Sequence, residues 1–85
     1  MTTTPITLKY PVTVDGHEYA VLTMRRCKVK DRRIAAKQKT DEDREITLIA
    51  NLCEVPPAVI DELDSADYEQ LQEVLRGFFG LSTAP

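Results

Sequence analysis

Apolar and polar residues alternate along the first part of the chain. The apolar positions are Ile6, Leu8, Tyr10, Val12 and Val14. Alternation with a period of two is typical of a β-strand that buries one face. Pro11 lies among the polar positions and has no N–H group to donate, so it indicates an edge strand or a local break. Asp15-Gly16 then predicts a turn into a second strand, because glycine accepts a positive φ angle.

The length of this turn decides the register of the predicted hairpin. A two-residue turn aligns Val12 with Tyr19, whereas a three-residue loop aligns Ile6 with Met24. We favour the three-residue loop because it gathers the apolar residues of both strands on one side. These residues are Ile6, Leu8, Tyr10, Ala20, Leu22 and Met24. Because a two-stranded hairpin is marginal in water, we expect helices to cover this face.

Three segments after residue 40 have helical periodicity. The first begins at Thr40 or Asp41, where acids suit the positive end of the helix dipole, and the prolines at 56–57 are expected to end it. A short second helix begins at Pro57. The third has Ser65 as its expected cap. Its apolar stripe is Tyr68, Leu71, Val74, Leu75 and Phe78.

These patterns predict an α+β fold, in which an N-terminal β-hairpin is followed by about three α-helices. A chain of 85 residues is expected to form a single small domain. We divide it into a hairpin at 6–25, a basic segment at 26–39, a helical region at 41–79 and a tail at 80–85. The basic segment has no clean apolar stripe, so it is either a short, partly frayed helix or a mobile arm.

The two kinds of charge occupy different parts of the chain. Eight of the eleven Lys and Arg residues lie between Arg25 and Lys39, and Asp31 is the only acid among them. Eleven acids and one base follow in residues 41–73, so the net charge of −3 conceals a strong separation. Charge blocks of this kind favour a surface that meets a partner over a pocket that holds a substrate.

Motifs for catalysis and for metal binding are missing from the sequence. A tetrahedral zinc site built from Cys and His alone needs four ligands, and the chain has three such residues, His17, Cys27 and Cys53. The three glycines do not form a phosphate-binding loop. The acids at 41–45 are better explained by the helix dipole than by a divalent cation. We therefore expect no enzymatic activity, no metal and no cofactor.

Both cysteines are expected to be reduced thiols. Cys53 fits a small apolar side chain, and the cations around Cys27 are expected to lower its pKa. No apolar run approaches the roughly 20 residues that span a bilayer, and the N-terminus lacks the features of a signal peptide. We therefore expect a cytoplasmic protein without a membrane partner.

Two parts of the chain are candidate contact surfaces for a partner. The adjacent rings of Phe78 and Phe79 point about 100° apart on a helix, so both cannot easily face one core. Leu71 and Leu75 fit core packing as well as partner binding. The basic segment is the second candidate. The candidate contact residues are Leu71, Leu75, Phe78, Phe79, Arg25, Arg26, Arg32 and Arg33.

The order of these parts resembles a known family. The matching segments are the strand at 6–12, the turn at Gly16, the strand at 22–25, the acid-led helix at 43–52 and the end at 63–79. With this order the chain is similar to the small tail assembly chaperones of contractile-tailed bacteriophages and Mu-like prophages. The resemblance covers residues 6–79.

The resemblance implies a protein that is not an enzyme. It implies that the protein binds the tape measure protein in the host bacterial cytoplasm and keeps it soluble until tail tube subunits polymerise around it. It also implies that the protein is absent from the mature virion. The tail tube protein and a second copy of the chain are further expected partners. The family also suggests ribosomal frameshifting, for which the codons of Phe78-Phe79-Gly80 would contain a slippery T-run.

A small nucleic-acid-binding regulator is the alternative function. The cations at 25–39 would neutralise several phosphates. However, this segment has no aromatic residue to stack on bases, and the acidic remainder opposes attraction to a polyanion. We therefore expect a protein partner rather than nucleic acid.

Overall fold

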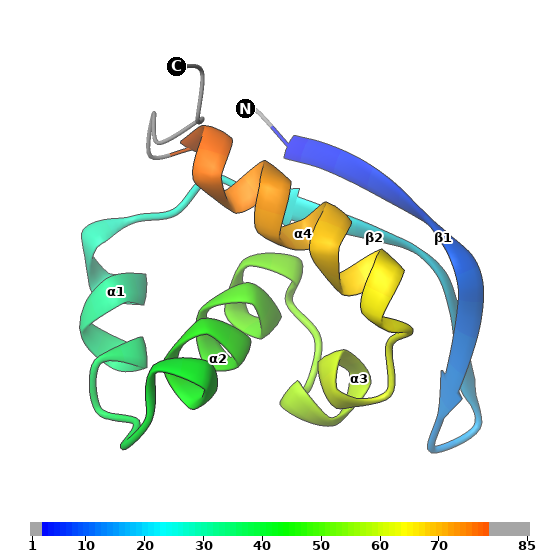
Figure 1. Cartoon of the computed structure of the whole chain (residues 1–85), viewed down its shortest axis with the longest axis horizontal. Helices are drawn as coiled ribbons and strands as arrows, with labels where there is room; N and C mark the ends of the chain where they lie inside the picture. Colours follow the sequence, from blue (N-terminus) through cyan, green and yellow to red (C-terminus); the bar gives the residue numbers. More distant parts are fainter. Residues whose placement is uncertain (1–2, 79–85) are drawn as a thin grey trace.

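The computed structural model describes residues 3–78 as two strands followed by four helices (Figure 1). The strands are β1 (Thr3–Val14) and β2 (His17–Arg25), and the helices are α1 (Val29–Ala35), α2 (Asp41–Cys53), α3 (Pro57–Asp61) and α4 (Ser65–Phe78). The predicted α+β fold of one small domain is confirmed. The three expected helices are α2, α3 and α4, and the basic segment supplies α1.

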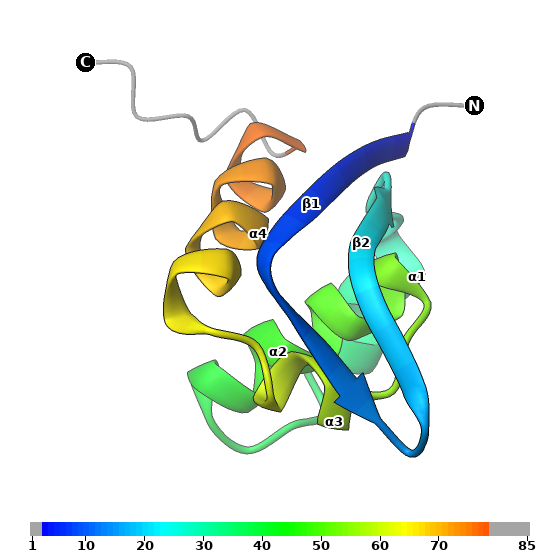
Figure 2. The ribbon, with the colours of Figure 1, turned by 90° about the vertical axis from the view of Figure 1, so that its right-hand side faces the viewer.

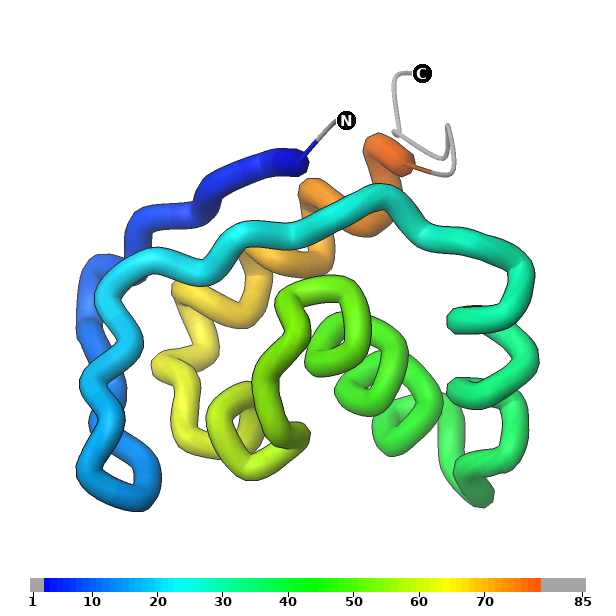
Figure 3. The backbone as a smooth tube through the Cα atoms, turned by 180° about the vertical axis from the view of Figure 1, so that it is seen from behind, coloured from blue at the N-terminus to red at the C-terminus, as the bar shows by residue number. Residues whose placement is uncertain are grey.

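The helices gather on one side of the hairpin (Figure 2). α4 packs along β1, and α2 packs against β2, which runs above α2 in Figure 3. The largest fully buried side chains of the core come from β2 and from three of the helices. They include Met24, Ile49, Leu52, Val59 and Leu71. The hairpin, which is too small to be stable alone, is therefore stabilised by this helical layer.

The turn of the hairpin has two residues, so the favoured three-residue loop is wrong. Asp15 and Gly16 have φ angles of 50° and 80°, which is the pattern of a type I′ turn. Val14 faces His17 across the turn. A type I′ turn follows the right-handed twist of the strands, which explains why it is preferred to the longer loop.

The register shifts in the middle of β1. Residues 8–11 stand opposite Ala20 alone, because Thr7 pairs with Val21 and Val12 pairs with Tyr19. This bulge turns Tyr10 outward and leaves it 56% exposed, although Leu8 remains in the core. The prediction that Tyr10 and Ala20 face inward is therefore wrong, while Pro11 lies at the local break that it indicated.

A buried carboxylate from α4 explains why the bulge is tolerated. The two carboxylate oxygens of Asp67 accept hydrogen bonds from the backbone N–H groups of Lys9 at 2.9 Å and Tyr10 at 3.0 Å. Asp67 is fully buried, and Gln70 donates a third hydrogen bond to it at 3.1 Å. Since an unpaired backbone N–H group costs stability when it is buried, Asp67 both satisfies the bulge and fastens α4 to β1.

Both ends of α2 are defined by local hydrogen bonds. The Thr40 hydroxyl caps the first turn by accepting from the N–H group of Asp43 at 3.0 Å. At the other end Glu54 adopts the left-handed conformation, and the Val55 N–H group donates to the Ala50 carbonyl at 3.0 Å. These are the features of a Schellman motif, so α2 ends before the two prolines that were expected to stop it.

The cap of α4 is Asp64 rather than the predicted Ser65. The Asp64 carboxylate accepts from the Ala66 N–H group at 2.9 Å, and its carbonyl accepts from the Tyr68 N–H group at 2.9 Å. Pro57 begins α3, as predicted. Within residues 3–78, no helix is long and apolar enough to span a bilayer.

Candidate functional site

α1 is held against the end of β2 by a buried carboxylate. Asp31 is 2% exposed and accepts two hydrogen bonds from the Arg25 guanidinium, at 2.8 and 3.0 Å. It also accepts the Lys28 N–H group at 2.9 Å. The bond from Arg25, with help from the Lys28 N–H group, lowers the pKa of Asp31 to about 2 against the opposing effect of burial. This anchor makes the basic segment a short helix, because seven residues have little helical stability alone.

Arg25 therefore has a structural use inside the domain. Hydrogen bonding to Asp31 raises the pKa of its guanidinium, and its Nε lies 3.5 Å from a carboxylate oxygen of Glu54. Glu54 is the residue that ends α2. Arg25 thus ties β2 to both α1 and α2, which gives this candidate contact residue a positioning role.

A groove opens between α1, α2 and α4. Its volume is about 310 Å³, and its floor is apolar. We name it the groove and define it by Arg32, Ala35, Ala36, Arg44, Glu45, Leu48 and Leu75. Two of the predicted contact residues, Leu75 and Arg32, line it. The small side chains of Ala35 and Ala36 allow another chain to approach the floor closely.

The polar residues on the rim of the groove are held by other parts of the fold. Glu45 accepts hydrogen bonds from the Tyr68 hydroxyl at 2.6 Å and from Gln72 at 2.8 Å, which links α2 to α4. Burial and the bond to Glu45 raise the pKa of Tyr68. Arg44 donates from Nε to the Gln38 carbonyl at 3.0 Å, just beyond α1. The rim is therefore preorganised, and the floor is the part that offers apolar contact.

A second pair of candidate residues meets at the end of α4. The guanidinium of Arg26 lies 5.2 Å from the centre of the Phe78 ring, within the range of a cation–π interaction. Arg26 also donates to the Phe78 carbonyl at 3.4 Å. α4 includes Gly77 and runs to Phe78. Phe79 and the predicted tail lie outside the described residues.

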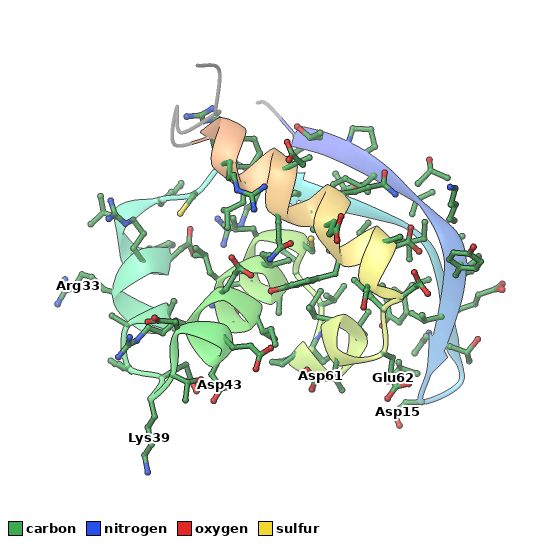
Figure 4. The ribbon with its side chains drawn as sticks, viewed as in Figure 1. Asp15, Arg33, Lys39, Asp43, Asp61 and Glu62 are labelled. Carbon is green, nitrogen blue, oxygen red and sulfur yellow. The ribbon has the colours of Figure 1, made fainter. Side chains whose placement is uncertain are left out.

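The structure does not gather all eight candidate residues. Leu71 is fully buried, so the core-packing interpretation applies to it. Arg33 is exposed and points away from the domain (Figure 4). The described residues therefore divide into core, anchor, groove, the Arg26–Phe78 pair and outer surface.

The two cysteines lie in different surroundings. Cys53 belongs to the core, as predicted, and burial raises its pKa to about 11. Burial and the Asp31 carboxylate raise the pKa of Cys27 as well, so the predicted lowering by neighbouring cations is wrong. Both thiols are therefore less reactive than a free cysteine.

Several residues of this site were not identified from the sequence. Ala35, Ala36 and Leu48 form the floor of the groove, and Asp31 fixes the helix beside it. The available signal was Asp31 itself, because a single acid within a basic block is a candidate for an internal ion pair.

A comparison with protein families gives a match over residues 5–80, to the family described as phage tail assembly chaperone proteins, E, or 41 or 14. Comparisons with curated proteins and with solved structures give no match. The family match spans the four described helices, β2 and all of β1 except its first two residues. The chain therefore belongs to the phage tail assembly chaperone family.

Proposed function

We propose that this protein binds the tape measure protein of its phage or prophage and keeps it soluble until the tail tube assembles. The observation that carries the proposal is the apolar groove between α1, α2 and α4, on a domain of the tail assembly chaperone family. A groove of this kind suits the apolar side of an amphipathic helix, whose aggregation it would prevent by covering that side.

The charge of the domain supports a role in solubility. The chain carries fourteen acids against eleven Lys and Arg residues, and most of the acids lie on α2, α3 and α4. A complex that buries the apolar groove and leaves the exposed acids of these helices in water stays soluble through charge repulsion between copies. Several weak contacts along a long partner would give avidity and still allow displacement by tube subunits.

The place and time of action follow from this role. The protein would act in the host cytoplasm during assembly and leave before the virion is complete. The tail tube protein, which displaces it, is a second proposed partner. A longer product made by ribosomal frameshifting near residues 78–80 is part of the proposal, and a gene without a slippery T-run at these codons would contradict that part.

Co-expression with the tape measure protein of the same phage tests the proposed function. We expect the soluble yield of the tape measure protein to rise and the two proteins to co-purify. Ala36→Trp should fill the groove and abolish both effects, because Ala36 is an exposed residue that lines it. The matched control is Ala58→Trp, at an exposed alanine of α3 away from the groove.

Circular dichroism would first establish that both tryptophan variants are folded. Equal soluble yield with and without the chaperone, together with no co-purification, would contradict the proposed function. Loss of binding in the Ala58 variant but not in the Ala36 variant would show that the tape measure protein binds near α3 and not in the groove.

A further inference from the structure

The outer side of α1 carries cations around an exposed isoleucine. Lys30, Arg33, Ile34 and Lys37 line a hollow of about 250 Å³, and we name these four residues the basic stripe. Lys30, Arg33 and Ile34 are three and four positions apart and lie along one side of α1. Lys37 lies in the turn that follows the helix, where its N–H group donates to the Ile34 carbonyl at 3.2 Å. Figure 4 shows the labelled Arg33 pointing away from the rest of the domain.

Folding does not account for the basic stripe. Among residues 3–78, no salt bridge involves Lys30, Arg33 or Lys37, in contrast to the buried pair of Arg25 and Asp31. All three cations are exposed, and the Ile34 side chain between them is 45% exposed. Water therefore surrounds an apolar side chain and three positive charges that make no internal ion pair.

The chemistry of the stripe favours a protein over nucleic acid. Ile34 has nothing to gain from a phosphate backbone, and the stripe contains no aromatic ring on which a base could stack. The acidic first turn of α2, residues 41–43, follows directly in the chain and would repel an extended polyanion. A short segment with a few carboxylates around an apolar side chain would match the stripe without meeting these acids.

We propose that the basic stripe binds an amphipathic helix whose apolar side chains are flanked by carboxylates. Ile34 receives an apolar side chain, and the three cations pair with the carboxylates around it. This inference rests on the proposed function and names the chemistry of the bound segment. Since Asp31 already fixes α1, the surface is ordered before binding, and less conformational entropy is lost on association.

Two synthetic amphipathic peptides of equal length and identical apolar stripe test the proposal. One carries Glu residues on the flanks of the stripe, and the other carries Lys residues at the same positions. Fluorescence anisotropy at low ionic strength measures the Kd of each peptide for the intact protein. We expect the Glu peptide to bind about tenfold more tightly, which is the scale of a few exposed ion pairs.

Charge reversal of the stripe provides the decisive variant. In the triple variant K30E/R33E/K37E we expect the preference to reverse, so that the Lys peptide binds more tightly than the Glu peptide. Circular dichroism establishes that the variant is folded, because an unfolded chain of the same net charge would also attract the Lys peptide.

The control reverses three exposed cations that lie outside the stripe, in the variant K9E/K39E/R76E. It changes the net charge by the same amount and should keep the preference for the Glu peptide. An equal loss of preference in this control would show that net charge, rather than the stripe, governs binding, and would overturn the proposal.

The same variants also test whether another kind of partner binds the basic stripe. Duplex DNA that binds at least as tightly as the Glu peptide would overturn the proposal, as would self-association that the stripe variant abolishes. Tape measure protein that co-purifies equally well with the stripe variant would also overturn it while leaving the proposed function intact. A peptide preference that reverses, without any capture of the tape measure protein, would support the stripe and contradict the proposed function.

Discussion

Replacing Asp31 with Asn tests the anchor of α1. The substitution keeps the size of the side chain but removes the charge that Arg25 binds at 2.8 and 3.0 Å. The pKa of Asp31 falls from 3.8 to about 2 in the folded protein, so the charged form is favoured by about 2 kcal/mol at ~1.4 kcal/mol per unit. We therefore expect the free energy of unfolding to fall by about 2–3 kcal/mol, out of a total on the order of 4–12 kcal/mol.

The same pKa gives this effect a defined pH dependence. Because the folded pKa of Asp31 lies below its unfolded value, its stabilising contribution is complete above about pH 4 and is lost as the pH falls through about 2. The stability difference between the wild type and Asp31→Asn should therefore shrink between pH 4 and pH 2. A difference that stays constant over this range would refute the assignment of the low pKa to Asp31.

Urea denaturation followed by circular dichroism measures the loss of stability, and hydrogen exchange locates it. The amides of α1 should lose protection first, since Asp31 holds this short helix. Asp41→Asn is the matched control, because it removes a fully exposed carboxylate that is paired with Arg44 on the surface. An Asp31 variant as stable as this control, with α1 still protected, would contradict the reasoning.

Substitutions at three further positions test other parts of the fold. Asp67→Ala leaves two backbone N–H groups of β1 without an acceptor. We therefore expect the free energy of unfolding, measured by urea denaturation, to fall by about 2–4 kcal/mol. A fall within error of zero would be incompatible with the role of Asp67. Thr40→Ala removes the cap of α2 and should cost about 1 kcal/mol, which Thr40→Ser should largely restore in the same assay. Glu54→Gly relieves a left-handed conformation and removes the exposed carboxylate that lies 3.5 Å from Arg25, an ion pair of small value at the surface. We expect a higher melting temperature and a net gain of up to about 1 kcal/mol; a lower melting temperature would argue against strain at this site.

Elements with a strong local signal were predictable from the sequence. The alternation in 6–14, the turn at Asp15-Gly16 and the apolar periodicity of α2 and α4 each depend on neighbouring residues alone. The family resemblance added the function class from the order of these elements, and the family match agrees with it.

Features that depend on distant residues were not predictable. The bulge in β1 is stabilised by Asp67, which lies 58 positions from Lys9 in the sequence. Nothing in the local pattern of either segment indicates this contact. A periodic pattern alone therefore gave the wrong register, although it identified Leu8 and Leu22 as core residues correctly.

The proposed contact surface likewise combines local signals with contacts between distant residues. The sequence predicted contact through the basic segment and the apolar end of α4, whereas the proposed groove needs α1, α2 and α4 together. α1 has weak helical periodicity, and its position depends on the ion pair between Asp31 and Arg25. Candidate residues such as Leu71 and Arg25 thus have internal roles that only the folded arrangement reveals.

We propose that the protein binds a helical segment of the tape measure protein at the surface around α1. Titration of the isotope-labelled protein with tape measure fragments, followed by NMR chemical shifts, tests it most directly. We predict that the largest shift changes fall on the groove and the basic stripe, from residue 30 to residue 37 and at Leu48 and Leu75. Changes confined to the hairpin and α3, or no changes at concentrations where the fragments stay soluble, would contradict it.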